Sequence, residues 1–300
     1  MNTDALPAAA AGSWMLGDLT VNRIGFGAMR LASKAPFSGG ASNDRDQSIA
    51  VLRRAVELGV NHVDTAAFYF TPLRSSNELI GRALAPYPED LVITTKVGPG
   101  RDPWGQWMAR ATPEQLRGQV EENIRQLGLD HLDVVNLRVQ DAGSIAEHFG
   151  ALSNLREAGL IRHLGVSEVT IAQLDEAQSI APVVCVQNLY GIDQRGDNDD
   201  VLRICGERGI AFVPFFAISG TSHASGASAT EREELVALAR ARGVTPAQVR
   251  LAWTLQRGSN VLAIPGTSNP VHLEENVAAG ALRFSEEELA VLNGLDKGSN

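Results

Sequence analysis

Cysteine is scarce in this sequence, which has only Cys185 and Cys205 among 300 residues. Cys185 lies in an apolar, strand-like run and Cys205 in a helix-like run, and no C-x-x-C pair is present. A disulfide framework and a C-x-x-C redox site are therefore excluded, and two buried free thiols are predicted.

Long apolar runs are absent as well. No segment approaches the roughly 18 apolar residues that a membrane-spanning helix needs. The N-terminal segment contains L-P-A-A-A-A-G but has neither a basic beginning nor a long apolar core, so we expect no signal peptide. These absences predict a cytoplasmic protein with no membrane partner.

Positive charge is in deficit, because 26 Lys and Arg residues face 35 Asp and Glu residues, for a net charge of −9. This balance argues against nucleic acid or an anionic membrane as a partner. An anionic cofactor stays compatible, because one site can be positive in an acidic protein. The residue pattern predicts no metal site and indicates no oligomeric state.

Short apolar runs alternate with helix-like runs along the chain. Runs of this kind are typical of parallel strands buried on both faces. The predicted strands are residues 23–27, 61–65, 91–96, 132–137, 163–167, 183–188, 211–215 and 261–265. Such alternation indicates a closed parallel barrel or a doubly wound sheet. The count of eight and the length, against about 250 residues for a typical barrel, favour an α/β (β/α)₈ TIM barrel spanning residues 1–300 as one domain.

Helix signals and additions complete this architecture. The segment 112–128 has Thr112 as a cap, Pro113 in its first turn and Gly128 as its stop. Residues 13–23 are predicted to form a hairpin that closes the bottom of the barrel. Helices at 245–257 and 285–293 are expected as additions to the eight repeats, and residues 1–12 are expected to be disordered.

Three chemically matched side chains follow the second and third predicted strands. Asp64 ends the second strand, Tyr69 follows it, and Lys96 ends the third. Barrel enzymes place their sites at these strand ends. An ammonium beside a phenol is expected to lower the phenol's pKa, so that Tyr69 becomes a usable general acid for a carbonyl oxygen. The alternative is an ordinary buried ion pair beside a tyrosine.

Arg138 ends the fourth predicted strand and faces the same mouth. Arginine is a strong, forked and permanently charged donor, so it could stabilise an oxyanion or anchor an anionic substrate group. It could instead pair with Asp141 or Glu168. By contrast, His62, His131 and His163 begin strands, so we expect them at the bottom or in the wall.

A hydride donor needs its own site. The motif G-F-G-A-M-R lacks the third glycine of a dinucleotide fingerprint. The segment A-I-P-G-T-S-N-P-V-H-L-E-E-N, after the eighth strand, combines a small-residue turn with a helix start, which is a phosphate site of the kind that barrels build there. The aromatic residues of A-F-V-P-F-F-A could stack on a nicotinamide.

These segments together resemble the aldo-keto reductase family, from about Val21 to Ala279. The matching stretches are G-F-G-A-M-R-L, D-T-A-x-x-Y, T-K-V-G, R-E-A-G-L-I-R-H-L-G-V-S, A-P-V-V-C-V-Q-N-L-Y and I-P-G-T-S-N-P-V-H-L-E-E-N. The resemblance implies a barrel that uses NADPH or NADP⁺ to reduce a small aldehyde or ketone, with Tyr69 as the acid of a tetrad. It also implies a cofactor set of Ala28, Met29, Asp64, Ser167, Gln187, Phe215, Ala217, Gly266, Thr267, Ser268, His272, Glu275 and Asn276.

The chain departs from the family pattern at three places. Arg138 replaces the tetrad histidine, Glu168 replaces the asparagine after Ser167, and Gly266 and His272 replace the basic residues that grip the 2′-phosphate. The motif V-N-L-R is closest to the pyridoxal reductase-like subset, which makes a pyridoxal-like substrate one candidate.

The substrate contacts and two further functions stay open. Trp104 and Trp107 are expected to contact the substrate together with Arg138, and His223 is a weaker candidate. One alternative function is reduction of a C=C or C=N bond, because family members with that activity alter the histidine position. Another is a redox-silent protein that binds NADPH, which retention of Asp64, Tyr69 and Lys96 disfavours.

Overall fold

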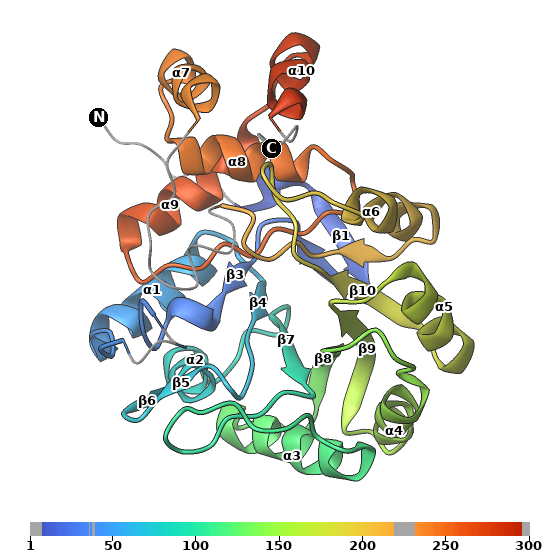
Figure 1. Ribbon diagram of the computed structural model, residues 1–300. Helices are drawn as coiled ribbons and strands as arrows, with labels where there is room; N and C mark the ends of the chain where they lie inside the picture. Colours follow the sequence, from blue (N-terminus) through green and yellow to red (C-terminus); the bar gives the residue numbers. More distant parts are fainter. Residues whose placement is uncertain (1–7, 36, 38–39, 219–231, 296–300) are drawn as a thin grey trace.

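The central feature is a ring of parallel strands surrounded by helices (Figure 1). The computed structural model describes residues 8–35, 37, 40–218 and 232–295. Seven strands form one parallel sheet in the order β11-β10-β9-β8-β7-β4-β3. Their bounds are β3 Phe26–Gly27, β4 His62–Asp64, β7 Val92–Val97, β8 Leu132–Arg138, β9 Ile161–Ser167, β10 Val183–Gln187 and β11 Ala211–Phe212.

The eighth predicted strand closes the ring by single bridges rather than as a continuous strand. Val261 bridges Phe212 and Ala263 bridges Ile24, both in parallel. The (β/α)₈ barrel is therefore confirmed, with strands shorter than predicted at 23–27, 211–215 and 261–265. Pro214 supplies one reason, because proline has no N–H to donate to a ladder.

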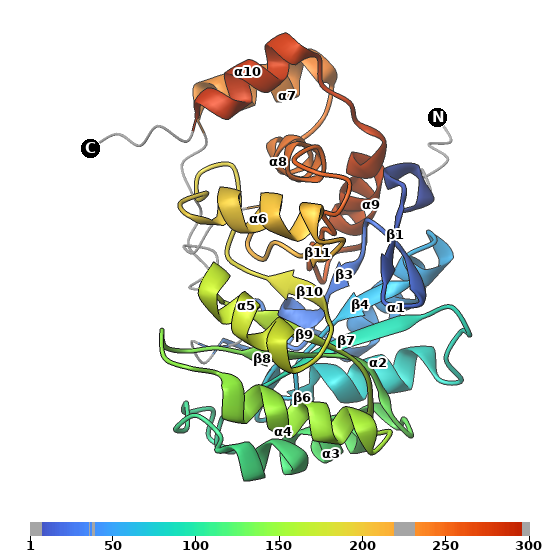
Figure 2. The ribbon, with the colours of Figure 1, turned by 90° about the vertical axis from the view of Figure 1, so that its right-hand side faces the viewer.

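In the described ranges, eight helices surround the strands. Figure 1 looks into this ring, and Figure 2 shows it from the side. Each of these helices follows a strand or, for α9, the closing segment 261–265, as the alternation of strand-like and helix-like runs predicts. They are α1 Arg45–Glu57, α2 Ser76–Leu84, α3 Leu116–Leu127, α4 Ala146–Glu157, α5 Ile171–Ile180, α6 Asn198–Glu207, α8 Pro246–Leu255 and α9 Pro270–Ala278. Short 3₁₀ helices are η1 Ala8–Ala11, η2 Ala28–Arg30, η3 Pro113–Gln115 and η5 Ala279–Ala281.

The helix predicted at 245–257 is not an addition to the barrel, and that expectation is wrong. Residues Gln248–Leu255 of α8 are all buried, so α8 takes a place in the ring. The additional pair is α7 Glu233–Arg242, which buries only Leu235 and Ala239, and α10 Glu286–Gly294. These two lie side by side away from the strands in both views and are joined by an ion pair between Arg242 and Glu288.

The predicted hairpin at 13–23 is present as β1 Ser13–Leu16 and β2 Leu19–Asn22, paired antiparallel. Leu16 and Val21 pack against side chains inside the barrel, including Val92 and Val134. Asp18 at the turn contacts Arg162 and His163, near the start of β9. The hairpin therefore closes the end of the barrel where the strands begin, as predicted.

Residues 8–12 are ordered, so the expectation of disorder over 1–12 is wrong for them. Ala8 and Ala11 of η1 are buried, and the backbone N–H of Ala8 donates to the carbonyl oxygen of Leu58 at 2.8 Å. Within the described part of the chain, every helix is too short or too polar to cross a membrane.

Candidate active site

A cavity of about 1280 Å³ opens where the parallel strands end. Its lining includes Asp64 from β4, Lys96 from β7, Arg138 from β8 and Gln187 from β10, together with Tyr69 from the loop after β4. Residues far apart in the sequence meet here because parallel strands all point to the same mouth. The prediction that these side chains share one mouth is confirmed.

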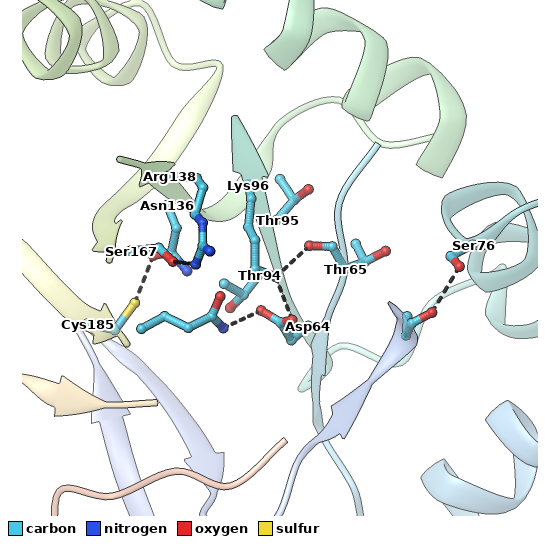
Figure 3. Close-up of polar contacts among 12 residues, drawn as sticks. Asp64, Thr65, Ser76, Thr94, Thr95, Lys96, Asn136, Arg138, Ser167 and Cys185 are labelled. Carbon is cyan, nitrogen blue, oxygen red and sulfur yellow. Dashed lines mark hydrogen bonds and ion pairs between the residues drawn. The ribbon is translucent and has the colours of Figure 1, made fainter. Parts of the chain in front are cut away.

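Asp64 and Lys96 form a buried ion pair inside the barrel (Figure 3). The Lys96 ammonium nitrogen lies 2.6 Å from Asp64 Oδ1 and donates to the Thr65 carbonyl oxygen at 3.0 Å. Burial lowers the pKa of Lys96, but Asp64 and the Tyr69 phenol outweigh it, so the pKa of Lys96 is raised. Lys96 is therefore a fixed positive charge at neutral pH.

Tyr69 is buried and lines the cavity beside this ammonium. The Lys96 nitrogen lies 5.1 Å from the centroid of the Tyr69 ring. Burial raises the pKa of Tyr69, and Lys96 lowers it by less, so the net direction is upward. The prediction of a lowered pKa is thus wrong for the protein alone. Removing the phenolate from water destabilises it more than the Lys96 charge stabilises it. The phenol keeps its proton at neutral pH.

Arg138 reaches from the end of β8 toward the end of β9 (Figure 3). Its Nη1 donates to Ser167 Oγ at 3.1 Å and lies 3.9 Å from Glu168 Oε1. Its guanidinium carbon lies 4.9 Å from the centroid of the Phe215 ring. Burial lowers the pKa of Arg138, and Glu168 opposes the shift. Asp141 pairs with Arg110 instead, at 3.0 Å, so Glu168 is the acidic neighbour of Arg138.

Gln187 has one amide atom in use and one without a partner. Its Nε2 donates to Asp64 Oδ2 at 2.8 Å, while its buried Oε1 accepts no hydrogen bond. Because buried polar atoms are normally satisfied, this oxygen is open to a hydrogen-bond donor that enters the cavity. The neighbouring Asn188 has a structural task, since its side chain bonds both the N–H and the carbonyl oxygen of Val169.

The turn after the barrel's closing segment packs against the end of β3. An added Cβ at Gly266 would lie 2.4 Å from the Gly27 carbonyl oxygen, so this position admits only glycine without a shift. The Oγ1 of Thr267 accepts from the N–H of Asn269, whose side chain caps α9. A small-residue turn leading into a capped helix start is the arrangement that binds phosphate.

The remaining predicted cofactor residues differ in their positions. Met29, Phe215, Ala217 and Gly266 line the cavity. Ala28, Ser167, Thr267, Ser268, His272, Glu275 and Asn276 do not line it. Of these, His272 is exposed, whereas Ala28, Ser167, Thr267 and Asn276 are buried.

Trp107 belongs to an aromatic wall beside Tyr69. Its ring centroid lies 5.3 Å from that of Phe37 and 5.7 Å from that of Phe68, and both phenylalanines line the cavity. Phe37 and Phe68 were missed from the sequence, although Phe68 directly precedes Tyr69. Trp104 does not line the cavity and is 80% exposed, so its expected substrate contact is not supported. His223 lies outside the described residues.

The strand-start histidines and the two cysteines have structural positions. His62 is buried, with Nε2 3.1 Å from Thr94 Oγ1, and His163 contacts the hairpin residue Asp18. Both cysteines are free and buried, as predicted. Burial raises the pKa of the Cys185 thiol, and that of Cys205 to about 12, so neither is a ready nucleophile.

Sequence comparison places these features in a family context. A sequence model described as the Aldo/keto reductase family matches residues 23–297. The pyridoxine 4-dehydrogenase of Escherichia coli strain K12 is 43% identical over 295 residues, covering 96% of this chain and 99% of that protein. An uncharacterized oxidoreductase of Schizosaccharomyces pombe is 38% identical over 292 residues, covering 97% of this chain and 92% of that one.

Solved structures agree in fold. A thermostable aldo-keto reductase, crystallised with the inhibitor epalrestat, superposes with a TM-score of 0.78 at 27% identity, covering 93% of this chain and 97% of that one. An aldo/keto reductase from Klebsiella pneumoniae, crystallised with NADP and acetate, gives a TM-score of 0.76 at 26% identity, with 92% of each chain covered.

Proposed function

The chain belongs to the aldo/keto reductase family and is an NADP-dependent oxidoreductase of small carbonyl compounds, and we propose that Tyr69 donates the proton in this reaction. The observation that carries the proposal is the buried pair of Lys96 and Asp64 directly beside the Tyr69 ring. A pyridoxal-type aldehyde is the proposed substrate, because the similar Escherichia coli protein is named pyridoxine 4-dehydrogenase.

The proposed role of Tyr69 follows from its protonation. Because the phenol is protonated at neutral pH, its Oη can give a proton to the carbonyl oxygen of a substrate in the cavity. The phenolate that remains is stabilised by the Lys96 ammonium, which Asp64 keeps charged and oriented. The hydride for the carbonyl carbon would come from NADPH bound in the cavity.

Arg138 is proposed as the second donor to the carbonyl oxygen. It stands at the end of β8, in the same cavity as Tyr69, and its guanidinium is held by Ser167 and Phe215. A fixed donor directed at a developing oxyanion lowers the barrier without reorganising during the reaction.

The residues present fit a nicotinamide dinucleotide. The unpartnered Oε1 of Gln187 suits the donor of a carboxamide, with Ser167 nearby, and the Phe215 ring suits stacking on an aromatic ring. The turn Gly266, Thr267 and Ser268 with the start of α9 suits phosphate. Ala28, Met29, Asp64, Ala217, His272, Glu275 and Asn276 complete the proposed set.

Two further points belong to the proposal. Trp107, with the aromatic wall of Phe37 and Phe68, is proposed to contact the substrate ring. A cytoplasmic location is proposed because Cys185 and Cys205 are free thiols, which is usual in a reducing compartment.

The test is NADPH oxidation with a panel of aldehydes, ketones, enones and imines that includes pyridoxal, using deuterium-labelled NADPH. Deuterium on the carbonyl carbon of the product alcohol is the expected result. Deuterium at the β-carbon of an enone, or turnover with imines alone, would instead support the C=C or C=N activity. Tight NADPH binding without turnover of any compound would support the redox-silent role.

A further inference from the structure

Glu168 has a backbone conformation that is unusual for its side chain. Its φ is 58°, in the left-handed region, and Phe216 is the other non-glycine residue with positive φ in the described ranges. Such a conformation costs free energy and persists where the surroundings hold it, often at functional sites. The Glu168 N–H donates to the Gln187 carbonyl oxygen at 3.1 Å, and the Leu189 N–H donates to Glu168 Oε1 at 2.8 Å. These two bonds fix the carboxylate at the cavity wall.

The fixed carboxylate faces Arg138. Glu168 Oε1 lies 3.9 Å from Arg138 Nη1, and the two side chains are 34% and 29% exposed. Opposite charges at this distance, partly shielded from water, interact appreciably. Arg138 is also held by Ser167 Oγ and the Phe215 ring. Loss of the Glu168 charge would therefore leave Arg138 in place, so the main contribution of Glu168 is its charge.

The charge of Arg138 would otherwise select the substrate. Arginine cannot lose its proton in the accessible pH range, so alone it presents a full positive charge. Lys96, another cation of the cavity lining, is already neutralised by Asp64. Without Glu168, the part of the cavity beside Arg138 would attract anionic compounds in general.

We propose that Glu168 is a specificity-determining residue. Its carboxylate offsets the charge of Arg138, so that the pair presents a hydrogen-bond donor of little net charge to the substrate oxygen. The site then takes aldehydes of zero net charge, and it disfavours aldehydes that carry a carboxylate or a phosphate. This inference rests on the proposed function, because it assumes that the carbonyl group is reduced beside Arg138.

The first test compares two aldehydes of similar shape and different charge, 4-carboxybenzaldehyde and its methyl ester. In Glu168→Gln, which keeps an acceptor for the Leu189 N–H, the ratio of kcat/KM for the acid over the ester should rise by about fivefold or more, or about 1 kcal/mol. A purely structural role would lower both values and leave the ratio unchanged, and that result would overturn the proposal.

Asp197→Asn is the matched control. Asp197 lines the same cavity, so the substitution removes one carboxylate there, but the ion pair of Arg138 is with Glu168. The ratio should stay within about twofold of wild type, since Asp197 is exposed and its charge is screened by solvent and salt. An equal rise in both variants would mean that the general field of the cavity, and not the Glu168–Arg138 pair, sets the selectivity, which would also overturn the proposal.

A second measurement does not depend on turnover. Calorimetric titration with benzoate should give a Kd about fivefold lower in Glu168→Gln than in wild type, whereas benzamide should show no such change. If the glutamine variant does not fold, Glu168→Asn replaces it, because asparagine tolerates positive φ. Unchanged benzoate affinity would overturn the role of Glu168, whereas the assigned carbonyl reduction would fail separately, if wild type turned over no carbonyl compound of the panel above.

Discussion

The Lys96 ammonium nitrogen lies 2.6 Å from Asp64 Oδ1 inside the barrel, where both side chains are almost fully buried. Burying one charge alone is costly, so each partner depends on the other. The pair places a permanent positive charge beside the Tyr69 ring. The same pair therefore affects both the stability of the barrel and, in the proposed reaction, proton transfer from Tyr69.

Lys96→Met is expected to lower both stability and activity. The free energy of unfolding should fall by about 3–5 kcal/mol, because Asp64 is left as an unpaired buried charge. The kcat should fall by about 10² or more, because the phenolate loses its stabilising ammonium. Urea unfolding and turnover corrected for the folded fraction measure the two effects.

The double variant Asp64→Asn with Lys96→Met separates the effect of Lys96 on stability from its effect on activity. It removes both charges, so it should recover most of the lost stability and none of the lost activity. Recovery of turnover with stability would show that Lys96 has only a structural role.

Tyr69→Phe should abolish turnover while NADPH binding is retained. The change removes one hydroxyl group and keeps the ring, which packs against Phe68 with centroids 5.1 Å apart. General acid catalysis contributes about 10²-fold or more, so kcat should fall by at least that factor. Stopped-flow NADPH oxidation measures the rate, and fluorescence titration checks the cofactor. If more than about a tenth of the wild-type kcat remains, Tyr69 is not the proton donor.

The sequence predicted the barrel because its strands are apolar on both faces and its helices carry clear caps and stops. It placed Asp64, Tyr69, Lys96 and Arg138 correctly because a barrel fixes where strand ends lie. It erred on α8, since a local pattern does not show which helix packs on the strands. The burial of the α8 side chains against the rest of the barrel can be seen only in the folded structure.

The features of the site that the sequence did not predict also depend on contacts that form only in the folded structure. The pKa of Tyr69 depends on burial as well as on Lys96, and the sequence shows only the charge. Phe37 joins the aromatic wall from the loop after β3, and nothing in its local sequence indicates this contact. The positive φ of Glu168, which its residue type does not predict, occurs together with its bonds to Gln187 and Leu189.

NADPH should bind at least about tenfold more tightly than NADH, or about 1.4 kcal/mol. The reason is the phosphate-type turn at 266–268 before the capped start of α9. Lysine cannot enter position 266 without a shift, because Gly27 lies too close, so the exposed His272 is the position open to improvement. His272→Arg should tighten NADPH and leave NADH unchanged in fluorescence titrations. A tenfold preference of wild type for NADH would contradict the assignment.

Acid should destabilise the protein through His62. Burial lowers the pKa of His62 from 6.5 to about 4. Between these pH values the unfolded chain binds a proton at His62 that the folded protein does not. The free energy of unfolding is therefore highest above pH 6.5 and falls as the pH drops. The free energy of unfolding should decrease by about 2 kcal/mol between pH 6.5 and about pH 5. Urea unfolding at several pH values should show a shallower dependence in His62→Phe, and an unchanged slope would refute the contribution of His62.

Arg138 should act on the substrate rather than on stability. It lines the cavity, and its hydrogen bond to Ser167 leaves Nε and Nη2 without a hydrogen bond among the contacts of the described residues. Arg138→Met should lower kcat/KM by about 10² or more, since a lost oxyanion donor costs about 2.7–4 kcal/mol in the transition state. The melting temperature should change little, because the Arg138 side chain is partly exposed and a partly exposed ion pair adds little to stability.

Arg138→His is the sharper variant, because histidine stands at this position in the family pattern that the chain otherwise resembles. If the Glu168–Arg138 pair presents a donor of little net charge, histidine can replace it, and small neutral aldehydes should keep substantial turnover. If Arg138 instead grips an anionic group, the variant should keep neutral aldehydes and lose a substrate that carries such a group. Steady-state kinetics on both kinds of aldehyde distinguish these roles. Loss of stability in both Arg138 variants with unchanged kinetics would make Arg138 only the ion-pair partner of Glu168.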